Sequence, residues 1–227
     1  MTLKKWVRLP SLWIENGGLR SLRWGAAGQG ADNTAALMAL AAIAHTADEE
    51  SGVARATYDG LCAATGLSRA KLSNGLIILE RLEIIKRTAG GRSLYKLTNY
   101  DPKIGWAKLP AKSMYSEDRI AAFDDFRLRR IAELDALKLF FLFVARRGRD
   151  TNLANISYDK IQEYTGIERA RIKSATSLLA SVSLAHIERV PSSVNELGVA
   201  NAYRIVGVDP YVHMGTIGRR MDQFGVT

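Results

Sequence analysis

The feature that most constrains this chain is an internal repeat in which equivalent residues lie 100 positions apart. Residues 57–73 and 157–173 are identical at six of 17 positions, and five further positions carry similar side chains. The identical pairs are Tyr58/Tyr158, Asp59/Asp159, Thr65/Thr165, Gly66/Gly166, Arg69/Arg169 and Ala70/Ala170. Ordinary composition would give about one identity by chance. The chain is therefore predicted to contain one structural unit twice.

The same offset relates other segments without a gap. Trp6–Pro10 and Trp106–Pro110 both read Trp-x-basic-Leu-Pro. Apolar residues at helical spacing also match, because Leu37, Leu40, Ala41 and Ala44 align with Leu137, Phe140, Phe141 and Val144. We therefore predict two domains, residues 1–102 and 103–207, followed by a tail over 208–227.

Each unit is predicted to form helix, helix, tight turn, helix and hairpin. In the first unit, Asp32 or Asn33 is expected to cap a helix that ends near His45. The remaining expected elements are helices 58–65, 69–82, 134–147, 158–165 and 168–182, with strands 84–87, 93–97, 184–190 and 201–206. Residues 116–130 are expected to add a helix to the second unit. Because Gly66 and Gly166 permit the turn of a helix-turn-helix, this order predicts an α+β, mainly helical fold of two tandem winged-helix domains.

The third helix of each unit is the predicted DNA-reading element. Its apolar residues share one face, and basic and amide side chains near its N-terminal end lie off that face. In helix-turn-helix motifs this end meets base edges, where Arg pairs with guanine and Asn with adenine. The candidates are Arg69, Lys71, Ser73 and Asn74, with Arg169, Arg171, Lys173 and Ser174. The alternative for these side chains is a solvated helix face.

Further contacts to DNA are expected outside the third helices. Ser68 precedes a helix N-terminus, which favours a phosphate. The hairpin cations Lys86, Arg87, Arg92 and Arg189 are candidates for phosphate or minor-groove contact.

Composition agrees with a polyanionic partner. Lys and Arg number 32 against 23 Asp and Glu, which gives a formal charge of +9. The single cysteine, Cys62, cannot form an intramolecular disulfide, and no apolar run reaches 18 residues. No metal-ligand spacing, P-loop or catalytic motif is recognisable. We therefore predict an intracellular, bacterial nucleoid- or plasmid-associated protein that is no enzyme and carries no cofactor, metal or catalytic site.

This order of elements, with its Thr-Gly turns, resembles bacterial winged-helix proteins and, more loosely, the replication initiators of plasmids and other mobile elements. The resemblance covers about 1–207 and implies one winged helix on each half of an origin repeat. The expected function is thus sequence-specific binding of double-stranded DNA in replication initiation. The alternatives are a transcriptional regulator, such as a repressor, and a winged-helix adaptor between proteins in chromosome or plasmid maintenance.

The helix around Phe140–Phe143 is apolar on more than one face. One face fills a core, and the surplus indicates an interface, either between the two units or between two protomers. A homodimer through Phe140–Phe143 is therefore a second expected assembly.

Overall fold

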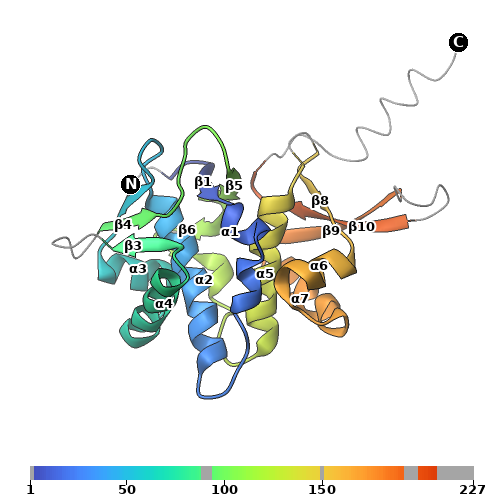
Figure 1. Ribbon diagram of the computed structural model, residues 1–227, viewed down its shortest axis with the longest axis horizontal. Coiled ribbons are helices and arrows are strands. Elements are labelled where there is room, and N and C mark those ends of the chain that lie inside the picture. The colour runs from blue at the N-terminus through green and yellow to red at the C-terminus, as the bar shows by residue number, and fades with distance from the viewer. Residues whose placement is uncertain (1–2, 88–93, 149–150, 192–198, 209–227) are drawn as a thin grey trace, which may run out of the picture.

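The computed structural model describes residues 3–87, 94–148, 151–191 and 199–208. It combines α-helices with small antiparallel sheets (Figure 1). We call residues 1–102 the first half and 103–207 the second half. The first half holds β1 (Trp6–Pro10), α1 (Leu12–Glu15), the 3-10 turn η1 (Gly18–Ser21), α2 (Gln29–Thr46), β2 (Val53–Arg55), α3 (Tyr58–Thr65), α4 (Arg69–Arg81), β3 (Ile85–Arg87) and β4 (Leu94–Leu97). The second half holds β5 (Trp106–Pro110), η2 (Lys112–Met114), β6 (Tyr115–Ser116), β7 (Arg119–Ile120), η3 (Ala121–Phe123), α5 (Ile131–Arg146), β8 (Leu153–Asn155), α6 (Tyr158–Thr165), α7 (Arg169–Ser181), β9 (Ala185–Pro191) and β10 (Val199–Ile205).

Both halves share an order of long helix, short strand, two helices and hairpin. In each half the last strand lies between the other two, giving the orders β2-β4-β3 and β8-β10-β9. The short strands β2 and β8 were not expected from sequence, because three residues carry too little periodic signal. None of the helices in the described ranges is both long and apolar enough to cross a bilayer.

Local capping explains why the second and third helices begin and end where they do. The Thr57 and Ser157 side chains accept hydrogen bonds from the backbone N–H of Gly60 and Lys160 at the starts of α3 and α6. Both helices end on a glycine with φ of 69°, Gly66 and Gly166. This is the left-handed region that glycine adopts without strain, so the expected tight turns are present.

The expected cap of the first long helix was wrong. Helix α2 begins at Gln29, after Gly28 with φ of 80°, and has no side-chain cap. Asn33 instead donates from its amide to the Arg23 carbonyl at 2.7 Å, and Asp32 pairs with Lys71. Both side chains thus serve tertiary contacts, which a local reading of helix starts cannot anticipate.

The helix expected within 116–130 is also absent. These residues, all described, form the end of the β6–β7 hairpin, the turn η3 and irregular chain leading to α5. Helix α5 starts at Ile131, three residues before the expected position. The Glu133 carboxylate accepts hydrogen bonds from the backbone N–H of Arg127, Arg129 and Arg130, which fixes this entry.

The two halves share one hydrophobic core. Helices α2 and α5 lie side by side in the centre, with α3 and α4 on one side and α6 and α7 on the other (Figure 1). Buried residues of both halves belong to a single continuous cluster. Helix α2 is buried around almost its whole circumference, from Asn33 to His45. A helix that is apolar all round is a central one, which accounts for this position.

The phenylalanines of α5 are buried within the chain. Phe140, Phe141 and Phe143 are each 0% exposed. Phe141 packs against Trp13 of the first half, and Phe143 stacks on Tyr203 with ring centroids 4.0 Å apart. The surplus apolar face therefore meets the other half, the first of the two expected outcomes. A homodimer stays a prediction, but Phe140–Phe143 offer it no exposed surface.

Polar contacts also join the halves. The buried His45 ring of α2 lies 2.9 Å, through Nε2, from the Pro110 carbonyl oxygen. Lys138 of α5 donates from Nζ to the Leu22 carbonyl at 2.8 Å. Burial lowers the pKa of Lys138 to about 8, because desolvation disfavours its charged form. These contacts tie the long helix of each half to the chain of the other.

A glycine sets how closely α4 approaches α2. A Cβ on Gly75 would lie 2.9 Å from the backbone carbonyl carbon of Ala35 and the backbone nitrogen of Ala36. We expect Gly75→Ala to lower the free energy of unfolding by about 1 kcal/mol, because the clash outweighs alanine's gain in helix propensity. Urea denaturation measures this. The matched change Ala175→Gly on α7 should cost about 1–2 kcal/mol, through lower helix propensity and the loss of a buried methyl group. A stabilised Gly75→Ala protein would contradict the close crossing.

Candidate nucleic-acid interface

The repeated Tyr-Asp and Arg residues form the same surface cluster in both halves. Arg69 pairs with Asp59, and Arg169 pairs with Asp159 at 2.7 Å. Each guanidinium also lies over the tyrosine ring beside its aspartate, 5.6 Å from the centroids of Tyr58 and Tyr158. These clusters join the start of α4 to α3 and the start of α7 to α6. Their conserved spacing within the chain thus has a structural role as well as a candidate binding role.

Both arginines remain accessible to a ligand. The Arg69 and Arg169 side chains are 68% and 65% exposed, and their aspartate partners are more exposed still. Exposed ion pairs of this kind contribute about 0–1 kcal/mol, so exchanging the aspartate for another anion costs little. Both guanidinium groups can therefore reach a phosphate or a base edge.

Lys71 and Arg171 lie differently from the expectation. Lys71 Nζ is 2.7 Å from Asp32 on α2, and Arg171 Nε is 3.0 Å from Asp135 on α5. About two thirds of each side chain is covered. Both cations thus bridge the third helix to the long helix of their own half. They are not part of the freely exposed face, and their binding of DNA stays a prediction.

The other predicted positions lie on the solvent side of α4 and α7. Asn74, Lys173 and Ser174 are exposed, and Ser73 is half-buried. Ser68 caps α4 by accepting from the Lys71 backbone N–H, so its hydroxyl already has one partner. Sequence reasoning missed Ile77, which is 52% exposed on the same face, one turn beyond Asn74. The equivalent position on α7 is the exposed Ser177.

The hairpin cations divide into two sets. Arg87 binds Glu80 of α4, and this hydrogen bond raises the pKa of Arg87 and lowers that of Glu80. Lys86 and Arg189 are exposed, whereas Arg92 lies outside the described residues. Two further cations share the outer sheet face with Lys86 but were missed. These are Arg55 and Lys96, and Lys96 sits directly opposite Lys86. Like charges in cross-strand register are unfavourable, so this face attracts an anion.

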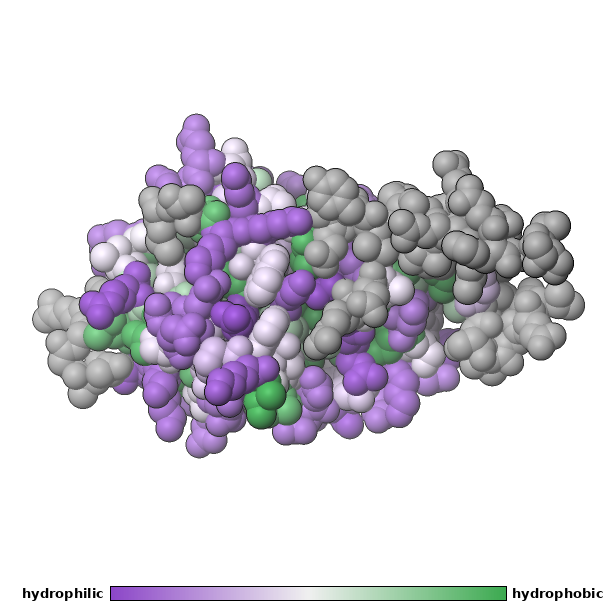
Figure 2. All heavy atoms as spheres, turned by 90° about the horizontal axis from the view of Figure 1, so that it is seen from above, coloured by the Kyte–Doolittle hydropathy of each residue, from purple (hydrophilic) through white to green (hydrophobic). Residues whose placement is uncertain are grey.

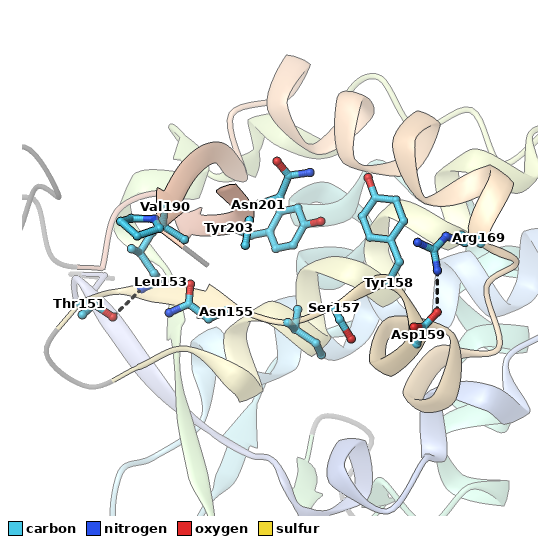
Figure 3. A pocket seen from close by; sticks show the side chains of 13 residues that line it. Thr151, Leu153, Asn155, Ser157, Tyr158, Asp159, Arg169, Val190, Asn201 and Tyr203 are labelled. Carbon is cyan, nitrogen blue, oxygen red and sulfur yellow. Dashed lines mark hydrogen bonds and ion pairs between the residues drawn. The ribbon is translucent and has the colours of Figure 1, made fainter. Parts of the chain in front are cut away.

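A cleft of about 680 Å³ lies beside the start of α7 (Figure 3). Tyr203 and Tyr158 face one another across it, Asn155 and Asn201 line it, and the Arg169–Asp159 pair lies at one end. Tyr203 is 1% exposed, and its hydroxyl has no partner at hydrogen-bonding geometry in the described chain. Burial, with a contribution from Tyr158, raises its pKa. The cleft therefore presents polar groups beside the candidate reading helix of the second half.

No group of three or more His, Cys, Asp or Glu in the described ranges is placed to hold a metal ion. The face seen in Figure 2 is mostly hydrophilic, and its apolar spots are small and separated. In comparisons with known proteins, no protein-family model and no curated protein matches the chain.

Proposed function

We propose that this protein binds double-stranded DNA sequence-specifically, with α4 and α7 as the reading helices of two winged helix-turn-helix modules. The observation that carries the proposal is the pair of equivalent third helices, each entered by a tight glycine turn and each exposing basic and polar side chains. Such helices enter the major groove, and the following hairpin contacts the flanking backbone. The formal charge of +9 supports a polyanionic partner.

Roles follow from exposure. Asn74 is proposed to read adenine, and Lys173 to read guanine, because these pairings match their hydrogen-bonding groups. Arg69 and Arg169 are proposed to bind either a base edge or a phosphate, because their guanidinium groups are exposed. The outer-face cations Arg55, Lys86 and Lys96 are proposed to bind phosphates, which position the protein without reading sequence. Their loss would weaken binding to all sequences alike.

Site selection from randomised duplex DNA tests the proposal. We expect one enriched site, and a loss of affinity for it of about thirtyfold or more in Arg169→Ala/Lys173→Ala, since two contacts are lost at about 1–3 kcal/mol each. The matched control is Lys103→Ala, which removes an exposed cation from the chain that connects β4 to β5. It should change affinity little.

Salt dependence separates reading from charge attraction. Binding that is unselective and falls steeply with salt in all three proteins would show only phosphate attraction and would contradict sequence reading. No binding at all would overturn the proposal and favour the adaptor between proteins.

The cellular role we propose is initiation of replication on a plasmid or mobile element, which rests on the resemblance of the element order to such initiators. Mapping the selected site onto the replicon that carries the gene tests this role. Several copies clustered at an origin would support initiation. A single copy over a promoter would instead identify a transcriptional regulator.

A further inference from the structure

The pairing of β1 with β5 has the symmetry of a two-fold axis. The strands are antiparallel, and Arg8 stands opposite Lys108, its own equivalent at the offset of 100. Trp6 stands opposite Pro110, and Pro10 opposite Trp106, so exchanging the halves leaves the register unchanged. A register that maps onto itself in this way occurs about a local two-fold axis.

The side chains on these strands repeat the symmetry. The rings of Trp6 and Trp106 stack with centroids 5.8 Å apart and planes 11° apart. Arg8 lies over the Trp106 ring at 5.1 Å, and Lys108 lies over the Trp6 ring at 4.8 Å. Each half therefore packs a cation on the tryptophan of the other half, so the two contacts are equivalent.

The segments that follow β1 and β5 cross over reciprocally. The turn η1 of the first half lies against α6, and β7 of the second half lies against α3. A Cβ on Gly66 would lie 2.7 Å from Arg119 Nη2, and one on Gly166 would lie 3.9 Å from Arg20 Cγ. An arginine from each half thus covers the helix-turn-helix glycine of the other. Arg119 brings its guanidinium to the C-terminal end of α3, where a cation is favourable, whereas Arg20 approaches the end of α6 through its aliphatic stem.

The same axis relates the two reading helices. Helices α2 and α5 pack on each other across the centre, and each carries its own third helix, α4 or α7, on the outer side (Figure 1). The shared core and the crossed segments join the two sides over many contacts. The reading helices are therefore held as an approximately two-fold pair, as in a symmetric dimer.

We infer that the DNA site of this protein is an imperfect inverted repeat, with its dyad on the axis between the halves. The inference rests on the proposed function. Two-fold related reading helices meet equivalent base edges only when the half-sites share that two-fold relation. Tandem half-sites would present one of the two helices with the opposite strand polarity.

The two half-sites differ in sequence because the reading faces differ. Ser73, Asn74 and Ile77 on α4 correspond to Lys173, Ser174 and Ser177 on α7. Asn74 and Ile77 favour an A·T-containing half-site, since asparagine pairs with adenine and an apolar side chain contacts the thymine methyl group. Lys173 favours guanine in the other half-site.

Equalising the two helices tests the inference. The variant Lys173→Ser/Ser174→Asn/Ser177→Ile gives α7 the residues that α4 carries at these three positions. The first half-site is taken from site selection with the unsubstituted protein. We expect the variant to bind a perfect inverted repeat of that half-site at least tenfold more tightly than a direct repeat with equal spacing. The converse variant, Ser73→Lys/Asn74→Ser/Ile77→Ser, should prefer an inverted repeat of the second half-site, and circular dichroism verifies that both variants fold.

Each outcome bears on a different statement. Preference of either folded variant for the direct repeat, or equal affinity for the two duplexes, overturns the inverted arrangement while leaving DNA binding intact. Absence of selective binding by the unsubstituted protein overturns the proposed function, and the inference with it.

Discussion

The free energy of unfolding is expected to fall by about 3 kcal/mol as pH drops from 6.5 to 4, because of His45 alone. Burial lowers the pKa of this fully buried imidazole from 6.5 to about 4, and the hydrogen bond with the Pro110 carbonyl opposes that shift. Two and a half units at about 1.36 kcal/mol each give this magnitude.

The direction follows from which state binds the proton. In the unfolded chain His45 takes up a proton near pH 6.5, whereas in the folded chain it does so only near pH 4. Between these values protonation therefore favours the unfolded chain. The stability that the neutral His45 ring contributes is fully present above pH 6.5 and is lost as pH falls to about 4. No further loss from this residue is expected in more acid solution.

The contacts of the ring explain why the neutral form is required. Nε2 donates to the Pro110 carbonyl, and Nδ1, 3.2 Å from the Tyr115 hydroxyl, accepts its proton. A protonated ring would place a second N–H against that hydroxyl in a desolvated contact. Since Pro110 and Tyr115 belong to the second half, acid should weaken the attachment of α2 to that half.

Urea denaturation at a series of pH values measures the effect as a difference between proteins. His45→Gln keeps a side-chain donor but cannot titrate, so its stability should depend less on pH between 6.5 and 4. His186→Gln is the matched control, because His186 is exposed on β9. Identical pH profiles for the unsubstituted protein and His45→Gln would refute the prediction.

Sequence alone located the local elements of the fold. The Thr-Gly turns, the cap Ser68 and the apolar spacing of α4 and α7 are local signals, and the bounds predicted for α3, α4, α6 and α7 agree within one residue. The first long helices were less well placed. In α2, Asp32 and Asn33 make tertiary contacts rather than capping the helix, and α5 begins three residues early because Glu133 accepts hydrogen bonds from the backbone just before it.

Contacts between the halves could not be predicted in the same way. The crossed segments 11–28 and 111–130 share little sequence. The first accordingly forms helical turns and the second a small hairpin. Their common feature is an arginine beside the opposite glycine, Arg20 or Arg119. The apolar surplus at Phe140–Phe143 did indicate an interface, but two outcomes remained open until the burial of these rings was known.

In the candidate site, too, local features could be predicted from the sequence and contacts between distant residues could not. Exposure of Arg69, Asn74, Lys173 and Ser174 follows from the helical wheel. The partners of Lys71 and Arg171 do not, because Asp32 and Asp135 lie 103 rather than 100 positions apart and so escape the repeat alignment. A basic residue that recurs in both halves therefore had two explanations, and the structure gives these two cations a contact with the long helices.

Replacing Arg171 should therefore damage the fold rather than a binding contact. We expect Arg171→Ala to lower the free energy of unfolding by about 2–3 kcal/mol. Asp135 is 3% exposed, and removing one partner of a buried pair costs about 3–5 kcal/mol. The expected loss is smaller because Arg171 is 33% exposed and Lys138 still lies near the carboxylate.

The pH dependence of this loss identifies its cause. Burial raises the pKa of Asp135, and Arg171 and Lys138 oppose the rise. Without Arg171 the pKa of Asp135 should rise further. A larger fraction of this buried carboxyl is then protonated, and so uncharged, in the folded variant at acid pH. Its stability deficit should be largest near neutral pH and shrink on acidification. Adding Asp135→Asn to Arg171→Ala should restore part of the lost stability, because the buried carboxylate without its arginine is removed and Lys138 keeps its hydrogen bond to the Leu22 carbonyl.

Two matched variants separate this role from DNA binding. Lys71→Ala breaks the corresponding contact with Asp32, which is 20% exposed, and should cost less than Arg171→Ala. Arg169→Ala removes an exposed guanidinium and should leave stability almost unchanged while weakening DNA binding. If Arg171→Ala were as stable as Arg169→Ala at neutral pH, the contact with Asp135 would not matter for folding. Arg171 would then return to the set of residues free to bind DNA.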